Sequence, residues 1–404
     1  MAIESAASLL KPLVNLVHTV TTPGWLLARL CLSSWGEADL TASALACCAG
    51  SGVIVLSLLW IAKLRAASHA WLAKAATRKQ PSDLQSPPDF SRRKILADAV
   101  LFSSAAGATL LVTDAACFAP ARLRLQRYTV AIPGLPHELH GLRLAQITDT
   151  HLGPRVPAEL IDLAIRMAID LDPHVFLLTG DYIHCGSEWL SPAARQFRPL
   201  VESGKPVVSV RGNHDWFNDG ERMARLLRDC GIPVIDNDRL FLSGTAGGPL
   251  SLSKHPSGPA LCLAGLGDLR QHFIDPDAAL RDVDPDIPRL VLSHNPDSAE
   301  EAAVTRKSAP RIDLMICGHT HGGQVRIPGV GTAASLLSRY GDKYAAGLVR
   351  GPACPVLISR GVGISLVPFR FLVPPEVVEI TLTRAPDEAR ADPHTLVRAA
   401  RIAT

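Results

Sequence analysis

Cys317-Gly318-His319-Thr320-His321-Gly322-Gly323 is the stretch that decides the fold. It follows the largely apolar residues 312–316, and an apolar run that ends in glycines predicts a buried strand followed by a tight loop. Imidazole is the commonest metal ligand in proteins. Because successive side chains of extended backbone point in opposite directions, His319 and His321 can serve one ion or two adjacent ions. A surface loop with two solvated histidines is the alternative for this stretch taken alone.

The same arrangement recurs upstream. From residue 142 onward, short apolar runs alternate with helical patterns, which is typical of a layered α/β domain. In open α/β sheets, ligand sites form at the carboxyl ends of the strands. Taken singly, polar residues there can be turn residues, helix caps or satisfied core histidines. Seven such groups at one sheet edge instead predict a shared metal site: Asp149, His151, Asp181, Asn213, His294, His319 and His321.

The order of these motifs resembles that of the calcineurin-like metallophosphoesterase superfamily. Later segments, residues 322–328, 359–363 and 368–371, resemble its membrane-anchored or twin-arginine-exported bacterial branch, which includes transmembrane proteins with a metallophosphoesterase domain. The resemblance implies an α/β fold, a four-layer α/β/β/α sandwich of two mixed sheets. The motifs D-x-H, G-D, G-N-H-D, H and G-H-x-H are matched by Asp149/His151, Gly180-Asp181, Gly212-Asn213-His214-Asp215, His294 and Gly318-His319-Thr320-His321.

The resemblance also implies a ligand set for two divalent metal ions, with Asp181 as the bridge. Mixed oxygen and nitrogen ligands favour Mn, Fe or Zn over Mg. Two such ions neutralise phosphoryl oxygens and convert a shared water into the hydroxide that attacks in line. The first ion is expected to be held by Asp149, His151 and His321, and the second by Asn213, His294 and His319.

Four further residues are candidates for catalysis or substrate binding. By resemblance, His214 contacts the phosphoryl group and protonates the leaving oxygen, and Asp215 is expected to hold its ring in orientation. Arg360 and Arg370 are candidates for binding a second anionic group, because guanidinium matches phosphate in a bidentate fork. For these two arginines, a surface ion pair is an equally weighted alternative.

The first 118 residues carry the membrane signals. Residues 42–62 contain no charged side chain and are long enough to cross a bilayer as a helix. A buried core helix is the alternative. The basic, proline-broken residues 63–94 favour the cytoplasmic face. Residues 95–118 follow Arg92-Arg93-Lys94 and are interpreted as a second membrane anchor or as an uncleaved twin-arginine-like signal.

These signals place the catalytic domain on the extracytoplasmic side of the bacterial cell membrane. Five scattered cysteines in the soluble part weigh mildly against export, because an odd number leaves one thiol unpaired. The expected segments are 1–41, a membrane-surface segment broken by prolines; 42–62, a transmembrane helix; 63–94, a cytoplasmic linker; 95–118, the second anchor or signal; 128–384, the phosphoesterase domain; and 385–404, a tail.

The expected function is metal-dependent hydrolysis of a phosphodiester or pyrophosphate in a phosphorylated lipid or cell-envelope substrate. A membrane anchor favours such a substrate over a freely diffusing one. One alternative is a UDP-2,3-diacylglucosamine-type pyrophosphate met on the cytoplasmic face. A second alternative, of another class, is a non-catalytic metal-binding scaffold, against which the presence of His214 counts. The net charge of +3 gives no reason to expect a nucleic-acid partner, and no obligate protein partner is inferred.

Overall fold

The computed structural model describes residues 103–104, 107, 114–385 and 402–403. The expected segments 1–41, 42–62 and 63–94 lie outside the described residues, as do most of 95–118 and of the tail. Among the helices that are described, none combines the length and the apolar character needed to cross a bilayer. The residues from Ala115 onward form one compact unit, which carries the predicted metal site.

A six-stranded sheet forms the first half of this unit, in the order β15-β1-β14-β2-β3-β4. The pairs β1–β14, β2–β3 and β3–β4 are parallel, whereas β14–β2 and β1–β15 are antiparallel, so the sheet is mixed. Its strands are β1 (Arg124–Ile132), β2 (Leu142–Ile147), β3 (Val175–Leu178), β4 (Val207–Ser209), β14 (Glu376–Arg384) and β15 (Ile402–Ala403).

A seven-stranded sheet, also mixed, forms the other half, in the order β12-β13-β9-β8-β7-β5-β6. A short separate hairpin pairs β10 (Arg326–Ile327) with β11 (Gly331–Thr332). The seven strands are β5 (Arg239–Gly244), β6 (Leu250–Ser253), β7 (Ala260–Gly265), β8 (Arg289–Leu292), β9 (Leu314–Cys317), β12 (Gly347–Arg350) and β13 (Pro355–Ile358).

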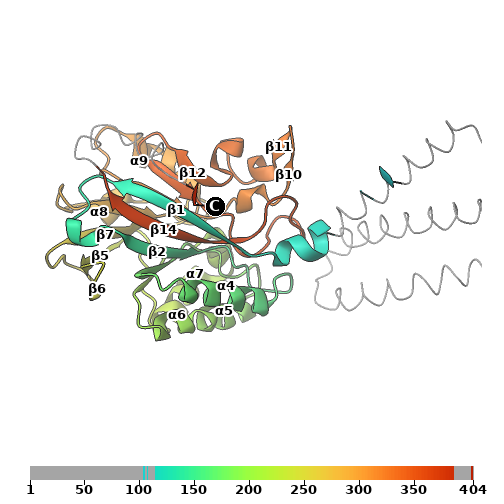
Figure 1. Ribbon diagram of the computed structural model, residues 1–404, viewed down its shortest axis with the longest axis horizontal. Coiled ribbons are helices and arrows are strands. Elements are labelled where there is room, and N and C mark those ends of the chain that lie inside the picture. Colours follow the sequence, from blue (N-terminus) through green and yellow to red (C-terminus); the bar gives the residue numbers. More distant parts are fainter. Residues whose placement is uncertain (1–102, 105–106, 108–113, 386–401, 404) are drawn as a thin grey trace, which may run out of the picture. The chain divides into compact units, whose positions relative to one another are not determined.

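Three apolar clusters hold the layers together. One lies between the two sheets and includes Leu144, Leu177 and Leu290. The second packs helices against the six-stranded sheet, and the third packs short helices against the seven-stranded sheet. The first helical layer comprises α4 (Ala158–Asp170), α5 (Leu190–Gln196), α6 (Arg198–Glu202) and α7 (Asn213–Asp229), which are grouped together in Figure 1; α8 (Pro276–Leu280) and α9 (Ala302–Thr305) belong to the other.

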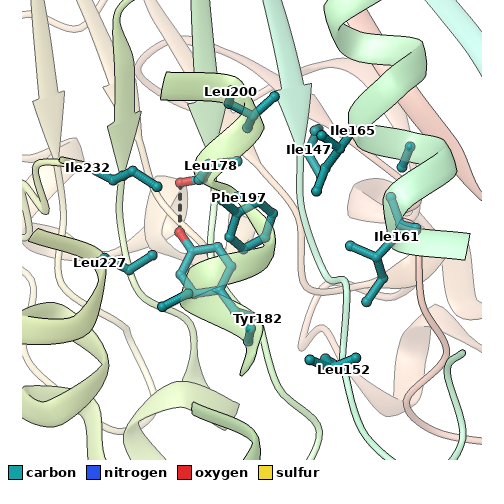
Figure 2. Packing of buried hydrophobic residues seen from close by; sticks show 14 of the residues in the cluster. Ile147, Leu152, Ile161, Ile165, Leu178, Tyr182, Phe197, Leu200, Leu227 and Ile232 are labelled. Carbon is teal, nitrogen blue, oxygen red and sulfur yellow. Dashed lines mark hydrogen bonds between the residues drawn. The ribbon is translucent and has the colours of Figure 1, made fainter. Parts of the chain in front are cut away.

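Helical spacing explains how α4 joins this core. Its buried residues Ile161, Ala164, Ile165 and Ala168 recur at intervals of three and four, which places them on one face of a helix. Figure 2 shows Ile161 and Ile165 facing Ile147 of β2. In the same cluster, the Tyr182 hydroxyl donates to the carbonyl oxygen of Leu178 at 3.1 Å, so this buried polar group is satisfied.

Candidate metal centre

Six of the predicted ligands meet at the carboxyl ends of β2, β3, β8 and β9. In each of two groups of three, the ligand atoms all lie within 4.8 Å of one another, and all six residues are buried. Oδ2 of Asp181 lies 3.5 Å from Nε2 of His151 and 3.2 Å from Nε2 of His294, so one carboxylate oxygen faces both groups. The first group is Asp149, His151 and His321, and the second is Asp181, His294 and His319.

Main-chain hydrogen bonds between neighbouring loops fix this convergence. The N–H of Asp149 donates to the carbonyl of Gly180, and the N–H of His151 donates to that of Asp181, both at 3.0 Å. The N–H of His319 donates to both carboxylate oxygens of Asp149 at 3.0 Å. Thus the loop after β2 is bonded to the loops after β3 and β9, and the ligands they carry are held in register.

Five site residues adopt the left-handed backbone region, which only glycine enters without strain. Each such residue costs about 1–3 kcal/mol and persists only where the surrounding structure enforces its conformation. Close packing provides that enforcement here: a Cβ atom at Gly318 would lie 2.2 Å from Oδ2 of Asp149. The five are Asp149 (φ 53°), His151 (48°), Asp181 (55°), His319 (72°) and His321 (51°).

The donor set fits a pair of divalent cations. Within the described part of the chain, Oδ1 of Asn213 is buried without a hydrogen-bond partner. A buried polar atom left unpaired costs about 1–3 kcal/mol, so such atoms call for a ligand. Two carboxylates, four imidazoles and one amide form the mixed oxygen and nitrogen set that suits Mn, Fe or Zn. Asn213 begins α7, and the N–H of the next residue, His214, donates to Oδ1 of Asp181.

The protonation states also suit metal binding, because a ligand must present a free electron pair. Burial lowers the pKa of His151, His319 and His321 well below the ordinary value, which keeps their imidazoles neutral. Burial would raise the pKa of Asp181, but the charges of His294 and His214 outweigh it and hold this pKa well below the ordinary value.

The pKa values of His294 and Asp149 are raised instead. Burial lowers the pKa of His294, but the neighbouring carboxylates, Asp181 foremost, outweigh it and raise the value to about 10. Burial raises the pKa of Asp149 to about 6, against the opposing charge of His294. The charged form of His294 is therefore favoured by Asp181, and its proton must leave before Nε2 can bind a cation.

His214 lies half-buried beside the first group, and a main-chain carbonyl holds its ring. Nδ1 lies 2.6 Å from the carbonyl oxygen of His184, and Nε2 lies 3.4 Å from Oγ of Ser365. The expectation that Asp215 orients this ring is wrong. The carboxylate of Asp215 is fully buried and accepts the main-chain N–H groups of Gly212, Asp181 and Tyr182 instead.

The two candidate arginines have different surroundings. Arg360 donates from its main chain and side chain to Glu376, which matches the ion-pair alternative. Arg370 is fully buried, and its guanidinium donates to the carbonyl oxygens of Gly363 and Val373 among others. A guanidinium without exposed surface has none to offer a substrate, so the substrate-binding interpretation of Arg370 is wrong. Nη2 also lies 3.3 Å from Nδ1 of His321, so Arg370 braces the loop that carries this histidine.

Two residues near the site were missed in the sequence. His184 forms a third group of metal-type side chains with His151 and His214, and its ring stacks on that of His214 at 5.2 Å between centroids. The sequence signal for His184 was its position three residues after the predicted ligand Asp181. Gln324 directly follows the GHTHGG stretch, and its amide bonds to main-chain groups of residues 365–369, which fixes Ser365 beside His214.

Comparison with known proteins gives consistent matches. The model of the family described as "Calcineurin-like phosphoesterase" matches residues 142–323. "Phosphodiesterase YaeI" of Escherichia coli K12 is 33% identical over 240 residues, covering 58% of this chain and 80% of YaeI. "UDP-2,3-diacylglucosamine pyrophosphatase LpxG" of Chlamydia trachomatis is 26% identical over 299 residues, covering 64% of this chain and 88% of LpxG.

A bovine relative adds a membrane connection. The "Transmembrane protein with metallophosphoesterase domain" of Bos taurus is 30% identical over 271 residues, which cover 64% of this chain. The match covers 57% of that relative, and 56% of its zebrafish counterpart, so the chain spans little more than half the length of these two proteins.

Proposed function

The chain belongs to the calcineurin-like phosphoesterase family, and from this premise we propose that it is a membrane-anchored hydrolase of a phosphodiester or pyrophosphate bond. The observation that carries the proposal is the position of Asp181. Its Oδ2 faces His151 of one ligand group and His294 of the other, at 3.5 and 3.2 Å. A carboxylate oxygen placed between two sets of ligands is the arrangement that a two-cation site needs.

Two divalent cations would be held here, Mn, Fe or Zn in preference to Mg. Bound cations supply Lewis acidity toward phosphoryl oxygens and lower the pKa of water. Asp149, His151 and His321 would hold the first cation, Asn213, His294 and His319 the second, and Asp181 both. The buried Oδ1 of Asn213, which has no hydrogen-bond partner, supports this assignment.

His214 is proposed as the residue that gives a proton to the leaving oxygen. The carbonyl oxygen of His184 can only accept a hydrogen bond, so Nδ1 of His214 donates it and Nδ1–H is retained in both the neutral and the charged ring. Nε2 is then the atom that gains and releases the proton, and it lies 3.4 Å from Oγ of Ser365. Asp215 acts on this reaction through the backbone that it holds, and is therefore a positioning residue. Arg360, paired with Glu376, is a candidate for a second anionic group of the substrate.

The substrate is proposed to be a phosphorylated lipid or an envelope-linked phosphate on the outer face of the cell membrane. The apolar segments 42–62 and 95–118 and the names of the bovine and zebrafish relatives support an anchored enzyme. The match to LpxG, which covers 88% of that protein, favours a second candidate, a UDP-2,3-diacylglucosamine-type pyrophosphate met on the cytoplasmic face. A reporter fused after Thr404 separates the two, because the face on which it appears excludes one of them.

The catalytic assignment is tested with the purified full chain, Mn and bis-p-nitrophenyl phosphate. His214→Ala should lower turnover about 10²–10⁴-fold, the usual contribution of general acid–base catalysis, while bound metal measured by mass spectrometry is unchanged. His255→Ala, at an exposed turn, serves as the matched control. Loss of metal in step with turnover would contradict the role of His214. A fully metallated wild-type chain without turnover on diesters and pyrophosphates would favour the scaffold alternative.

A further inference from the structure

Exposed apolar side chains gather on the hairpin formed by β10 and β11. Val330 is 81% exposed and Ile327 is 51% exposed, and Leu372, at 56%, lies against them. These three residues line one surface hollow together with the rest of the turn. We call Ile327, Val330 and Leu372 the hairpin surface. Large apolar side chains exposed together, rather than singly, mark an interaction surface.

The tip of the hairpin is rigid and carries no charge. The N–H of Val330 donates to the carbonyl of Ile327 at 3.0 Å, which closes a four-residue turn over Pro328 and Gly329. Gly329 has a φ of 79°, and proline followed by a left-handed glycine is the signature of a type II turn. The turn therefore holds Ile327 and Val330 outward instead of letting them collapse onto the domain.

The hairpin surface adjoins the place where the chain enters the compact unit. The N–H of Arg326 donates to the carbonyl of Phe371 at 2.9 Å, and the N–H of Arg370 donates to the carbonyl of Ala115 at 3.1 Å. Figure 1 shows β10 and β11 on the side of the unit where Ala119–Ala121 lies. Ala115 stands near the end of the apolar residues 95–118, the second predicted membrane segment of the sequence.

The exposed charges around the hairpin surface are mostly basic, and the acidic exception is Asp342, which accepts hydrogen bonds from Thr332 of β11. Arg326 on the hairpin is exposed, as are Arg122 and Arg124 at the chain's entry. Apolar side chains flanked by basic ones bind at the boundary between headgroups and acyl chains, and each nearby cation adds attraction to anionic lipids. A lipid bilayer satisfies both features at once.

The hairpin surface is also tied to the metal centre. Gln324, two residues before Arg326, accepts the main-chain N–H groups of Ser365 and Leu366. Leu366 is exposed, and Oγ of Ser365 lies 3.4 Å from Nε2 of His214. Hydrogen bonds of Gln324 therefore link the segment beside the hairpin to the residue proposed as the proton donor.

We propose that the hairpin surface contacts the lipid bilayer and holds the mouth of the metal centre at the headgroup level. A lipid-linked substrate then reaches His214 along Leu372 and Leu366 without leaving the leaflet. The delivery of substrate to His214 rests on the proposed function, whereas the contact between the hairpin surface and the bilayer does not.

The contact is tested by photocrosslinking of the full chain in vesicles of phosphatidylethanolamine and phosphatidylglycerol. Benzoylphenylalanine is placed at Val330, at Ile327 in a second protein, and at Leu163 as the control, an exposed apolar residue on α4. Phospholipid adducts at Val330 and Ile327 should exceed those at Leu163 about tenfold. Equal yields, or crosslinks to a second copy of the chain, would overturn the proposal.

A second measurement tests delivery of the substrate. Replacing Ile327 and Val330 together by aspartate should lower hydrolysis of a phosphodiester lipid in vesicles, relative to bis-p-nitrophenyl phosphate in solution, about tenfold. An unchanged ratio would overturn the path along Leu372 and Leu366. If the wild-type chain hydrolyses neither compound, the proposed function fails, while the crosslinking result still decides the membrane contact.

Discussion

The main-chain N–H of Asp181 donates a 2.9 Å hydrogen bond to Oδ2 of Asp215. The same oxygen accepts the N–H of Gly212 at 2.8 Å, and Oδ1 accepts that of Tyr182 at 2.9 Å. One carboxylate thus joins the loop after β3 to the start of α7. It holds in place the backbone of the residue that faces both ligand groups.

Asp215→Asn should destabilise the protein. The amide retains one accepting oxygen and replaces the other by a donor, which leaves at least one buried N–H unpaired, at about 1–3 kcal/mol in the free energy of unfolding. Urea titration measures this loss, and titration with Mn should show weaker metal binding. Asp229→Asn, at the exposed end of α7, is the matched control. Equal stability of the two variants would contradict the role given to Asp215.

Arg370→Lys should destabilise the protein by about 3 kcal/mol or more, because several buried carbonyl oxygens lose their donor. An ammonium group cannot reproduce the planar set of donors that a guanidinium offers. Metal binding should weaken as well, since Arg370 braces the His321 loop. Arg166→Lys, on the exposed face of α4, controls for the change of residue type. If a folded Arg370→Lys protein bound metal as tightly as the wild type, Arg370 would not support the metal centre.

Gly318→Ala should displace the carboxylate of Asp149. The added Cβ would lie 2.2 Å from Oδ2 of Asp149 and 2.3 Å from Oγ1 of Thr148, closer than any real Cβ contact. We expect a loss of about 1–3 kcal/mol in stability from this overpacking, together with weaker metal binding. Gly247→Ala is the control, because nothing lies within 4 Å of a Cβ atom there. Calorimetry measures metal binding to both variants. Equal metal affinity of the two would contradict the prediction.

The backbone strain at His319 can be measured apart from its ligand atoms. In the presence of a chelator, His319→Gly should be about 1 kcal/mol more stable than His319→Ala, since glycine accepts a φ of 72° without strain. His294, which is absent from the left-handed residues, should show the opposite order. If alanine were more stable than glycine at both positions, His319 would not be strained.

His174 predicts a pH dependence of stability. Its Nδ1 accepts the N–H of Arg143 at 2.8 Å, and burial lowers its pKa below the ordinary 6.5, against the opposing contribution of the Ala246 backbone. Between the two pKa values the unfolded chain binds more protons, so stability falls as the pH drops below 6.5 and levels off beneath the folded-state pKa.

His174→Gln keeps an acceptor for Arg143 and removes the titration. Urea titrations between about pH 7.5 and about pH 5 should therefore give a flatter stability curve for this variant than for the wild type. His255→Gln, at an exposed turn, should leave the curve unchanged. Parallel curves for the wild type and His174→Gln would contradict the assignment.

The convergence of ligands could be predicted from the sequence because it depends on where apolar runs end. The residues after β2 and β3 follow parallel neighbours of one sheet, and those after β8 and β9 follow parallel neighbours of the other, so each pair meets at the carboxyl ends of its own sheet. The expectation of a single sheet edge was wrong, because the packing of the two sheets brings the two sets of strand ends together. The roles of Asp215 and Arg370 could not be predicted in this way. Both bind main-chain groups from distant loops, and a pattern of side chains contains no signal for such partners.

The hydrogen bond from Gly212 to Asp215 is the exception, because it spans only three residues. A carboxylate at the third helical position commonly accepts the main-chain N–H of the residue before the helix. Asp215 could therefore have been recognised as a capping residue of α7 from the sequence G-N-H-D. Its two other partners, Asp181 and Tyr182, become visible only in the folded chain.

The five left-handed site residues have an evolutionary consequence. At each position glycine would relieve the backbone strain, so selection for a functional centre acts against the conformational preference of the backbone. A descendant freed from that selection could lose its ligands one at a time, and each loss would relieve the strain at one position. Loss of activity in this lineage is therefore expected to leave a well-folded protein, whereas regaining the centre would require several unfavourable steps together.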